Sequence, residues 1–296
     1  MKDFIFGGIL CLSAVPLMAA TASGSTDTAS AVLGYQFGTP YTSSSGYSYY
    51  NGYDNASAAL GPIQSDTSGG YGPDPFLPAW DTSQLTIVAP GGSITLQMAQ
   101  PVSGNGMLGV FTDVAINNVS TTVGSEPQAS TPASTLSPFP EAIVSVGDGS
   151  KNAGGDYILV PLNGGNPITF ENPTNYYTNS LVSVQSGPGY YYVQSSLGTQ
   201  PADWTKPFLG NLASFNGETY SQMVATLDGS AGGTWLNLAS AGLSQVDVVQ
   251  FSVPTGATYH MTLDSVAAPE PNALELVGLG IVAMALMPRR ARWRLL

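Results

Sequence analysis

The chain has 296 residues, of which only 9% are charged, and its formal net charge is −12 at pH 7. Residues 23–270 hold seventeen Asp and Glu residues but only two cations, Lys151 and Lys206, so this stretch has a net charge of −15 and no arginine. Such a surface repels a phosphate backbone, which excludes nucleic acid as a partner. A composition with few charged residues, most of them acidic, is typical of an exported protein. Divalent cations or neutral glycans could be the ligands of such a surface.

The first 22 residues have the pattern of a Sec signal peptide. Lys2 precedes an apolar core over residues 4–15, and small residues follow. This pattern predicts cleavage after Ala22, with a retained membrane anchor as the alternative. The single cysteine, Cys11, would leave with the signal peptide, so the mature chain can form no disulfide and offers no thiolate to a metal.

Residues 23–72 are rich in Gly, Ser, Tyr and Asn, most densely over 41–53. Two interpretations stay open. The stretch could be a low-complexity adhesive patch, in which tyrosine supplies stacking faces and a hydroxyl. It could instead be a first strand over 31–37 followed by a long loop at the edge of a sheet, and the strand-like sequence of 31–37 favours this second interpretation.

Alternating apolar and polar residues mark the next strands. Segments 83–89 and 93–99 flank Pro90-Gly91-Gly92 and predict a β-hairpin. The more continuously apolar run 107–116 predicts a central-type strand. Residues 120–140 are rich in Ser, Thr and Pro and have too little apolar content for a core, so they are predicted as one long loop between strands.

Short segments separated by turn residues follow, and they predict further antiparallel strands. These segments are 141–146, 156–160, 168–170, 190–193, 223–227 and 245–253. Residues 234–243 hold the one expected helical turn.

The last predicted strand is 258–266, in which Tyr259, Met261 and Leu263 are expected to face inward. The side chains that alternate with them are expected to face outward, and they are His260, Thr262 and Asp264. Together the strands predict one all-β, antiparallel domain, a β-sandwich over residues 23–268 with little helix.

Three elements follow in order over residues 269–296. Pro269-Glu270-Pro271 comes first, an apolar run covers 276–287, and four arginines come last: Arg289, Arg290, Arg292 and Arg294. The prolines disfavour helix, so the tripeptide is expected to be extended. The apolar run could pair its backbone internally in lipid, although it is shorter than the about 20 residues of a spanning helix. The arginines would hold their end in the cytoplasm.

This order of elements resembles the PEP-CTERM sorting signal of bacterial surface proteins. The resemblance implies that a membrane-embedded exosortase processes the tail near the tripeptide. It also implies that 276–287 forms a transmembrane-type helix and that everything upstream is extracytoplasmic. The alternative is an apolar C-terminal helix that docks on the domain and has a basic, frayed end.

A second resemblance lies within the domain. The segments that carry it are Pro75-Phe-Leu-Pro78, Gly91-Gly-Ser-Ile-Thr-Leu-Gln97, Pro101-Val102 and Leu108-Gly-Val-Phe-Thr-Asp113. They are similar to a group of PEP-CTERM cell-surface proteins regarded as jelly-roll-like. The chain departs from that group at Gly106-Met107-Leu108, which offers no carboxylate where the group has an Asp. The resemblance implies a jelly-roll-like β-sandwich flanked by a signal helix and a transmembrane-type helix.

The sequence shows no catalytic constellation. A hydrolytic triad needs a histidine beside a nucleophile and a carboxylate, and the one histidine, His260, is expected on a polar surface. One histidine without a mature cysteine also suits zinc poorly. Calcium takes loop carboxylates and carbonyls, so its candidate ligands are Asp148, Asp156 and Asp264. Asp beside Gly is equally ordinary turn chemistry.

Aromatic side chains can stack on sugar rings, which makes Tyr190, Tyr192 and Trp204 candidate glycan contacts, with packing at a sheet edge as the alternative. The first function hypothesis is an exported structural or interaction protein of the cell surface or exopolysaccharide, delivered by the C-terminal signal. The second is a carbohydrate-binding module. The third is a secreted glycoside hydrolase, which would need a carboxylate pair that no motif identifies among the many acids.

Overall fold

The computed structural model describes residues 27–40, 52–64, 81–119, 128–134, 139–174, 184–187, 190–193, 201–215, 217–218 and 220–269. The predicted signal peptide, most of the Tyr-rich stretch 41–53 and the tail from Glu270 onward lie outside these ranges. Within them the chain is mainly β, its paired strands all run antiparallel, and it has one α-helix. The prediction of an all-β, antiparallel fold is confirmed.

One layer of the molecule is a six-stranded sheet ordered β1-β3-β13-β7-β8, with β9 also paired to β7. Its strands are β1 (Ala29–Gln36), β3 (Ser93–Ser103), β7 (Glu141–Gly147), β8 (Val160–Pro161), β9 (Ile168–Thr169) and β13 (Gln245–Ser252). The edge strand β1 has two register irregularities against β3. Such bulges discourage pairing of an edge with another chain.

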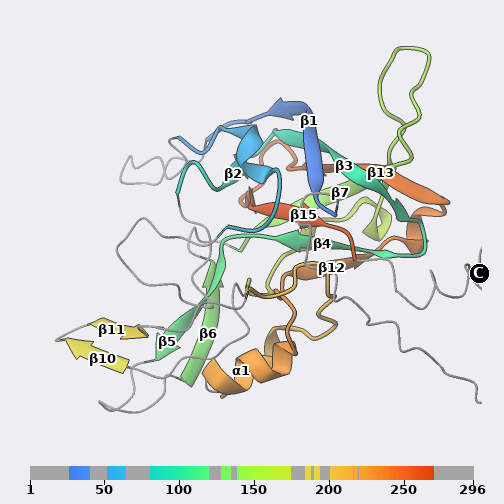
Figure 1. Cartoon of the computed structure of the whole chain (residues 1–296). Coiled ribbons are helices and arrows are strands. Elements are labelled where there is room, and N and C mark those ends of the chain that lie inside the picture. The colour runs from blue at the N-terminus through green and yellow to red at the C-terminus, as the bar shows by residue number, and fades with distance from the viewer. Residues whose placement is uncertain are drawn as a thin grey trace, which may run out of the picture.

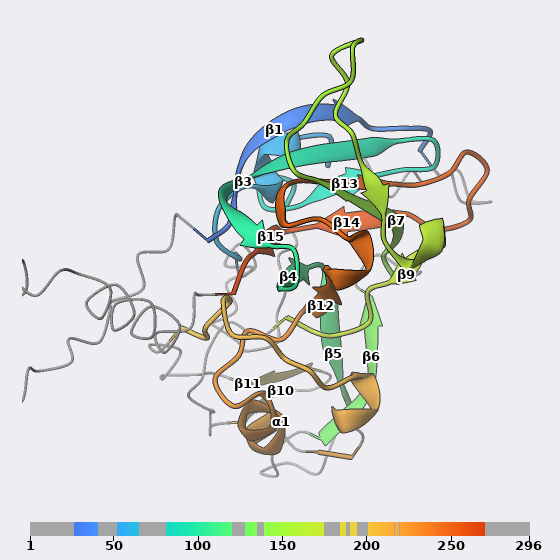
Figure 2. The ribbon, with the colours of Figure 1, turned by 90° about the vertical axis from the view of Figure 1, so that its right-hand side faces the viewer.

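The opposite layer is a three-stranded sheet of β12 (Thr234–Asn237), β4 (Met107–Phe111) and β15 (Ser265–Ala267). A separate pair, β2 (Thr86–Val88) with β14 (Met261–Leu263), joins it through the chain, because only Asp264 separates β14 from β15. Both views show β1, β3 and β13 on one side of this body and β4 and β12 on the other (Figures 1 and 2).

One hydrophobic core lies between the two layers. Alternate side chains of β3 and β7 point into it, among them Leu96 and Val144, and β4 and β15 contribute Leu108 and Val266 from the opposite side. Because successive strand residues face opposite sides, a period of two brings one full face of each sheet into this core. The removal of that apolar surface from water is the main term that holds the layers together.

The predicted hairpin around Pro90-Gly91-Gly92 is wrong, because its two strands lie in different sheets. β2 pairs with β14, whereas β3 pairs with β1 and β13. The link between them is an arch in which the Ala89 amide donates to the Phe37 carbonyl at 2.7 Å. A Cβ on Gly92 would lie 2.4 Å from that same Phe37 oxygen. The glycines therefore serve a close passage between backbones and not a tight hairpin turn.

The predicted strand 107–116 is in fact two strands, β4 and β5 (Val114–Val119), which part at Thr112 and Asp113. β5 pairs with β6 (Gln128–Ser134), so the predicted loop 120–140 contains a strand. The Ser, Thr and Pro content of this stretch is typical of a loop. A strand outside the main core, however, depends first on a neighbour that pairs with its backbone, and β5 supplies one.

A smaller cluster surrounds the helix α1 (Tyr220–Leu227). The buried residues of the helix are Met223, Val224 and Leu227. They pack against Phe208 and Phe215, whose rings stack with centroids 5.3 Å apart. The strand predicted over 223–227 is therefore wrong, because its apolar positions also fit one face of a helix.

The strand predicted over 190–193 is confirmed, since β11 (Tyr190–Val193) pairs with β10 (Val184–Gly187). The helical turn predicted over 234–243 is only partly correct, because β12 comes first and a 3-10 helix, Ala239–Ala241, follows it. Further 3-10 helices of the described residues are Ala56–Ala59, Asn163–Gly165 and Leu212–Phe215.

Candidate functional site

Residues 260–268, which we call the closing segment, are buried throughout. The expectation that His260, Thr262 and Asp264 face solvent is therefore wrong. The chain changes partners at Asp264, since β14 pairs with β2 and β15 with β4. Residues 61–64 cover this point, because the Gln64 amide donates to both carboxylate oxygens of Asp264 at 3.2 Å. With neighbours on every side, the segment has no outward face.

A carboxylate, an imidazole and a hydroxyl, the side-chain types of hydrolytic enzymes, lie at this junction. They belong to Asp113, His260 and Thr262, and each of these residues is 0% exposed. The Thr262 hydroxyl donates to Asp113 Oδ1. Burial lowers the pKa of His260, and the charge of Asp113 acts in the opposite direction. Asp113 is not among the site residues predicted from the sequence. The sequence did hold one indication of its role, because Asp113 lies within the apolar run 107–116. A buried central strand accommodates a carboxylate only if the carboxylate has a partner.

A histidine, a carboxylate and a hydroxyl can act together in acyl transfer only if a substrate reaches the hydroxyl. All three side chains are enclosed, so this arrangement cannot act on a substrate in the described fold. A buried hydrogen bond between a hydroxyl and a carboxylate instead fixes how the elements that carry them meet. Asp113 and Thr262 accordingly fix the junction between β4, β5 and β14.

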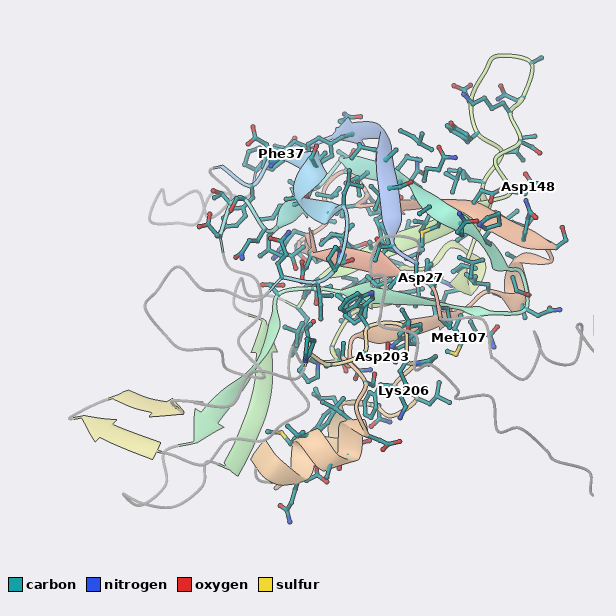
Figure 3. The ribbon with its side chains drawn as sticks, viewed as in Figure 1. Asp27, Phe37, Met107, Asp148, Asp203 and Lys206 are labelled. Atoms are coloured by element: carbon teal, nitrogen blue, oxygen red, sulfur yellow. The ribbon has the colours of Figure 1, made fainter. Side chains whose placement is uncertain are left out.

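The two ends of the described chain meet at one place. Thr28 forms an antiparallel bridge with Ala267, and the Ala268 amide donates to the Asp27 carbonyl at 2.6 Å. We call these four residues, Asp27, Thr28, Ala267 and Ala268, the terminal clasp. Asp27 is labelled in Figure 3 near the centre of the molecule.

The predicted sorting motif begins immediately after the terminal clasp. Pro269 is its first residue and the last one described, and it is partly exposed. The other motif residues lie outside the described part, and they are Glu270, Pro271, Arg289, Arg290, Arg292 and Arg294. The apolar run 276–287 also lies outside. The structure therefore places the start of the motif directly beside a finished strand.

The predicted calcium ligands do not gather at one place. Asp148 and Asp156 belong to an exposed arm, residues 148–159, which projects from the sheet between β7 and β8 (Figures 1 and 3), whereas Asp264 is buried in the closing segment. The Asp148 carboxylate accepts a backbone N–H two residues on at 2.9 Å, and this bond lowers the pKa of Asp148. Asp156 accepts from the Asn152 side chain at 3.3 Å. Among the described residues no three His, Cys, Asp or Glu side chains are arranged to hold a metal ion.

The aromatic candidates differ in their surroundings. Trp204 is half-buried and packs against a cluster that contains Phe111, Ala231 and Ala267, so its ring helps to fasten a loop to β4 and β15. Tyr190 and Tyr192 lie on β11, of which the structure describes the backbone but not the side chains. A glycan site at these three residues stays a prediction.

No family model matches the chain, and neither a curated protein nor a solved structure matches it. Within the described ranges, no helix has both the length and the apolar content that a membrane crossing requires. The chain's own residues, above all those at its terminal clasp, therefore have to support any functional interpretation.

Proposed function

We propose that this chain is an exported structural or interaction protein of the cell surface or exopolysaccharide, sorted by a C-terminal signal of the PEP-CTERM kind. In this proposal residues 1–22 are a signal peptide, residues 23–268 form the extracytoplasmic body, and residues 269–296 are the sorting tail. The body is a jelly-roll-like β-sandwich between a signal helix and a transmembrane-type helix. Two antiparallel layers around one core support this assignment of the fold.

The position of the terminal clasp is the observation that carries the proposal. β15 ends at Ala267, and the amide of Ala268 is bonded to Asp27. The last strand of the body is thus complete two residues before Pro269, and the sheets described here use no residue of the tail. A tail with this position can be cut, or held in the membrane, without loss of a core strand.

The tail would have two partners. An exosortase-type membrane enzyme would act at Pro269-Glu270-Pro271, and the lipid bilayer would receive residues 276–287. That run is shorter than the about 20 apolar residues of a full span, so it depends on the four arginines to hold its cytoplasmic end. Residues 23–270 have no arginine and a net charge of −15. This charge favours a polysaccharide environment for the body over contact with nucleic acid.

Replacement of the arginines tests the sorting signal. Changing Arg289, Arg290, Arg292 and Arg294 to Ser should abolish tail processing and envelope localisation, because the positive-inside contribution is lost. The matched control changes the same four residues to Lys, which keeps the charge and should keep both. Immunoblots of cell, envelope and medium fractions measure the outcome. Normal maturation of the Ser variant would refute the proposal.

A truncation tests what the body does alone. The chain should end after Pro269, because Ala267 and Ala268 belong to the folded body. The truncated body should fold and escape into the medium. If it stays at the cell surface, the body itself binds there, and the function becomes that of a carbohydrate-binding module. A pull-down on purified exopolysaccharide would then identify the ligand.

A further inference from the structure

The terminal clasp holds the chain tightly up to the first residue of the sorting motif. Ala267 is 0% exposed and is paired on both edges, with Gly109 of β4 and with Thr28. Ala268 is 8% exposed, and its amide is bonded to Asp27. Pro269 is the first residue after the closing segment that is partly exposed.

An enzyme that cuts a peptide binds it as an extended chain and uses backbone groups of that chain. A cleft that takes four residues before the cut needs about 13–14 Å of free chain, at about 3.3–3.6 Å per residue. A cut within or directly after Pro269-Glu270-Pro271 lies at most three residues beyond the terminal clasp, which is at most about 10 Å of extended chain. Ala267 and Ala268 cannot add to this length, because their backbone partners lie in the body.

We propose that the terminal clasp gates tail processing, and this inference rests on the function proposed above. The tail is cut while the clasp is open, before β15 has docked or after it has been released. Once Ala267 and Ala268 are paired, the folded body protects the motif. Because Thr28 lies directly before the first strand and Ala267 ends the last, the clasp can close only after the whole body has been exported.

A spacer in the full-length chain tests the gate. Insertion of Gly-Ser-Gly-Ser between Ala268 and Pro269 adds about 13 Å of free chain and leaves the body intact. Pulse–chase analysis in the native host should show processing at least threefold faster than in the wild type, which should be cut only soon after synthesis. The control places the same four residues between Gly154 and Gly155 in the arm, and it should be processed at the wild-type rate. An unchanged rate with the spacer at Ala268 would overturn the gate.

The arginine variants separate failure of the gate from failure of the sorting proposal. If the Arg-to-Ser chain loses processing while the spacer has no effect, the gate alone is wrong. If the Arg-to-Ser chain is processed normally, or the wild type keeps its tail throughout, both proposals fail. Hydrogen exchange on the purified full chain gives an independent measurement. The Ala268 amide should exchange at least a hundredfold more slowly than in an unfolded peptide, and free exchange would show an open clasp and overturn the gate.

Discussion

The closing segment and the arm both contain aspartate, yet the fold treats these carboxylates in opposite ways. In the closing segment Asp264 is 0% exposed and accepts from the Gln64 amide. In the arm Asp148 is exposed and accepts from its own turn. The difference teaches that an aspartate takes its role from what covers it, here residues 61–64 from a distant part of the chain.

Removal of a large apolar side chain should separate the two regions most clearly. Leu263 in the closing segment is 0% exposed, and Leu263→Ala should lower the free energy of unfolding by about 2–5 kcal/mol. Ile158 in the arm is 52% exposed, and Ile158→Ala should change it by less than about 1 kcal/mol. Urea unfolding of both variants measures the contrast, which equal losses would contradict.

The buried network should give the next largest effect. Thr262→Val keeps the shape of the side chain but removes the donor to Asp113, which should cost about 1–3 kcal/mol of unfolding free energy. The control is Thr258→Val at an exposed position just before the closing segment, where the change should stay within about 0.5 kcal/mol. Chemical denaturation of both variants is the test. A harmless Thr262→Val would mean that Asp113 does not depend on this hydroxyl.

The alternation of apolar and polar residues in the sequence correctly predicted strands that have one face on the core. Segments 93–99 and 245–253 became β3 and β13, because their alternate residues are buried. The same rule failed at 258–266, where both faces are covered and polar side chains find buried partners. It could not assign β2 and β3 to different sheets either, since the arch at residues 90–92 depends on contacts with Phe37 and Val253, far away in sequence.

Local sequence pattern gave the wrong type of element, for a different reason, at α1 and at β6. Residues 223–227 fit a strand or a helical face, and the stacked Phe208 and Phe215 that favour the helix cannot be located from the sequence. For the candidate site, the sorting motif from Pro269 stays a prediction of the sequence, whereas the burial of Ala267 depends on its pairing with Gly109 and with Thr28. Such pairing is a property of the folded chain and not of the segment.

Acid should weaken the closing segment and not the arm. His260 has a pKa below its ordinary value of 6.5, mainly because of burial. As pH falls below 6.5 the unfolded chain binds a proton that the folded chain does not, so stability decreases by at most about 1.4 kcal/mol per pH unit until the folded-state pKa is reached. The lowered pKa of the exposed Asp148 matters only at pH values below its ordinary 3.8.

Thermal unfolding at pH 7.5 and pH 5.5 tests this expectation. The midpoint of the wild type should fall on acidification, and that of His260→Gln, which has no group titrating at this position, should fall less. Equal shifts in the two proteins would show that His260 is not the group responsible. The quantity compared is the change in unfolding midpoint between the two pH values within each protein. A loss of stability in the variant that is the same at both pH values therefore does not affect the result.

Cleavage of the arm should have the smallest effect on stability. Trypsin cuts after Lys unless Pro follows, and Lys206 precedes Pro207, so Lys151 is the one site expected within residues 23–268. Lys151 is exposed and lies over the Tyr157 ring at 4.4 Å. The nicked body should stay assembled, with a free energy of unfolding within about 1 kcal/mol of the intact chain.

Native and denaturing mass spectrometry of the digest measure this outcome. Lys151→Ser should resist the enzyme under the same conditions. Separation of the two fragments without denaturant would mean that the arm contributes to the fold as much as a core strand does.

The terminal clasp also brings the first and last residues of the body so close together that the two ends could be joined. The first and last described strands lie beside each other, so a short bridge from Ala268 back to Asp27 would close the chain into a ring without moving a strand. Such a ring could be opened again at the tip of the arm, between Gly154 and Gly155, where both residues are exposed. The permuted chain would keep every contact of the two layers while its ends emerged far from the point of attachment. The place where the proposed tether joins this body is thus independent of how the body folds.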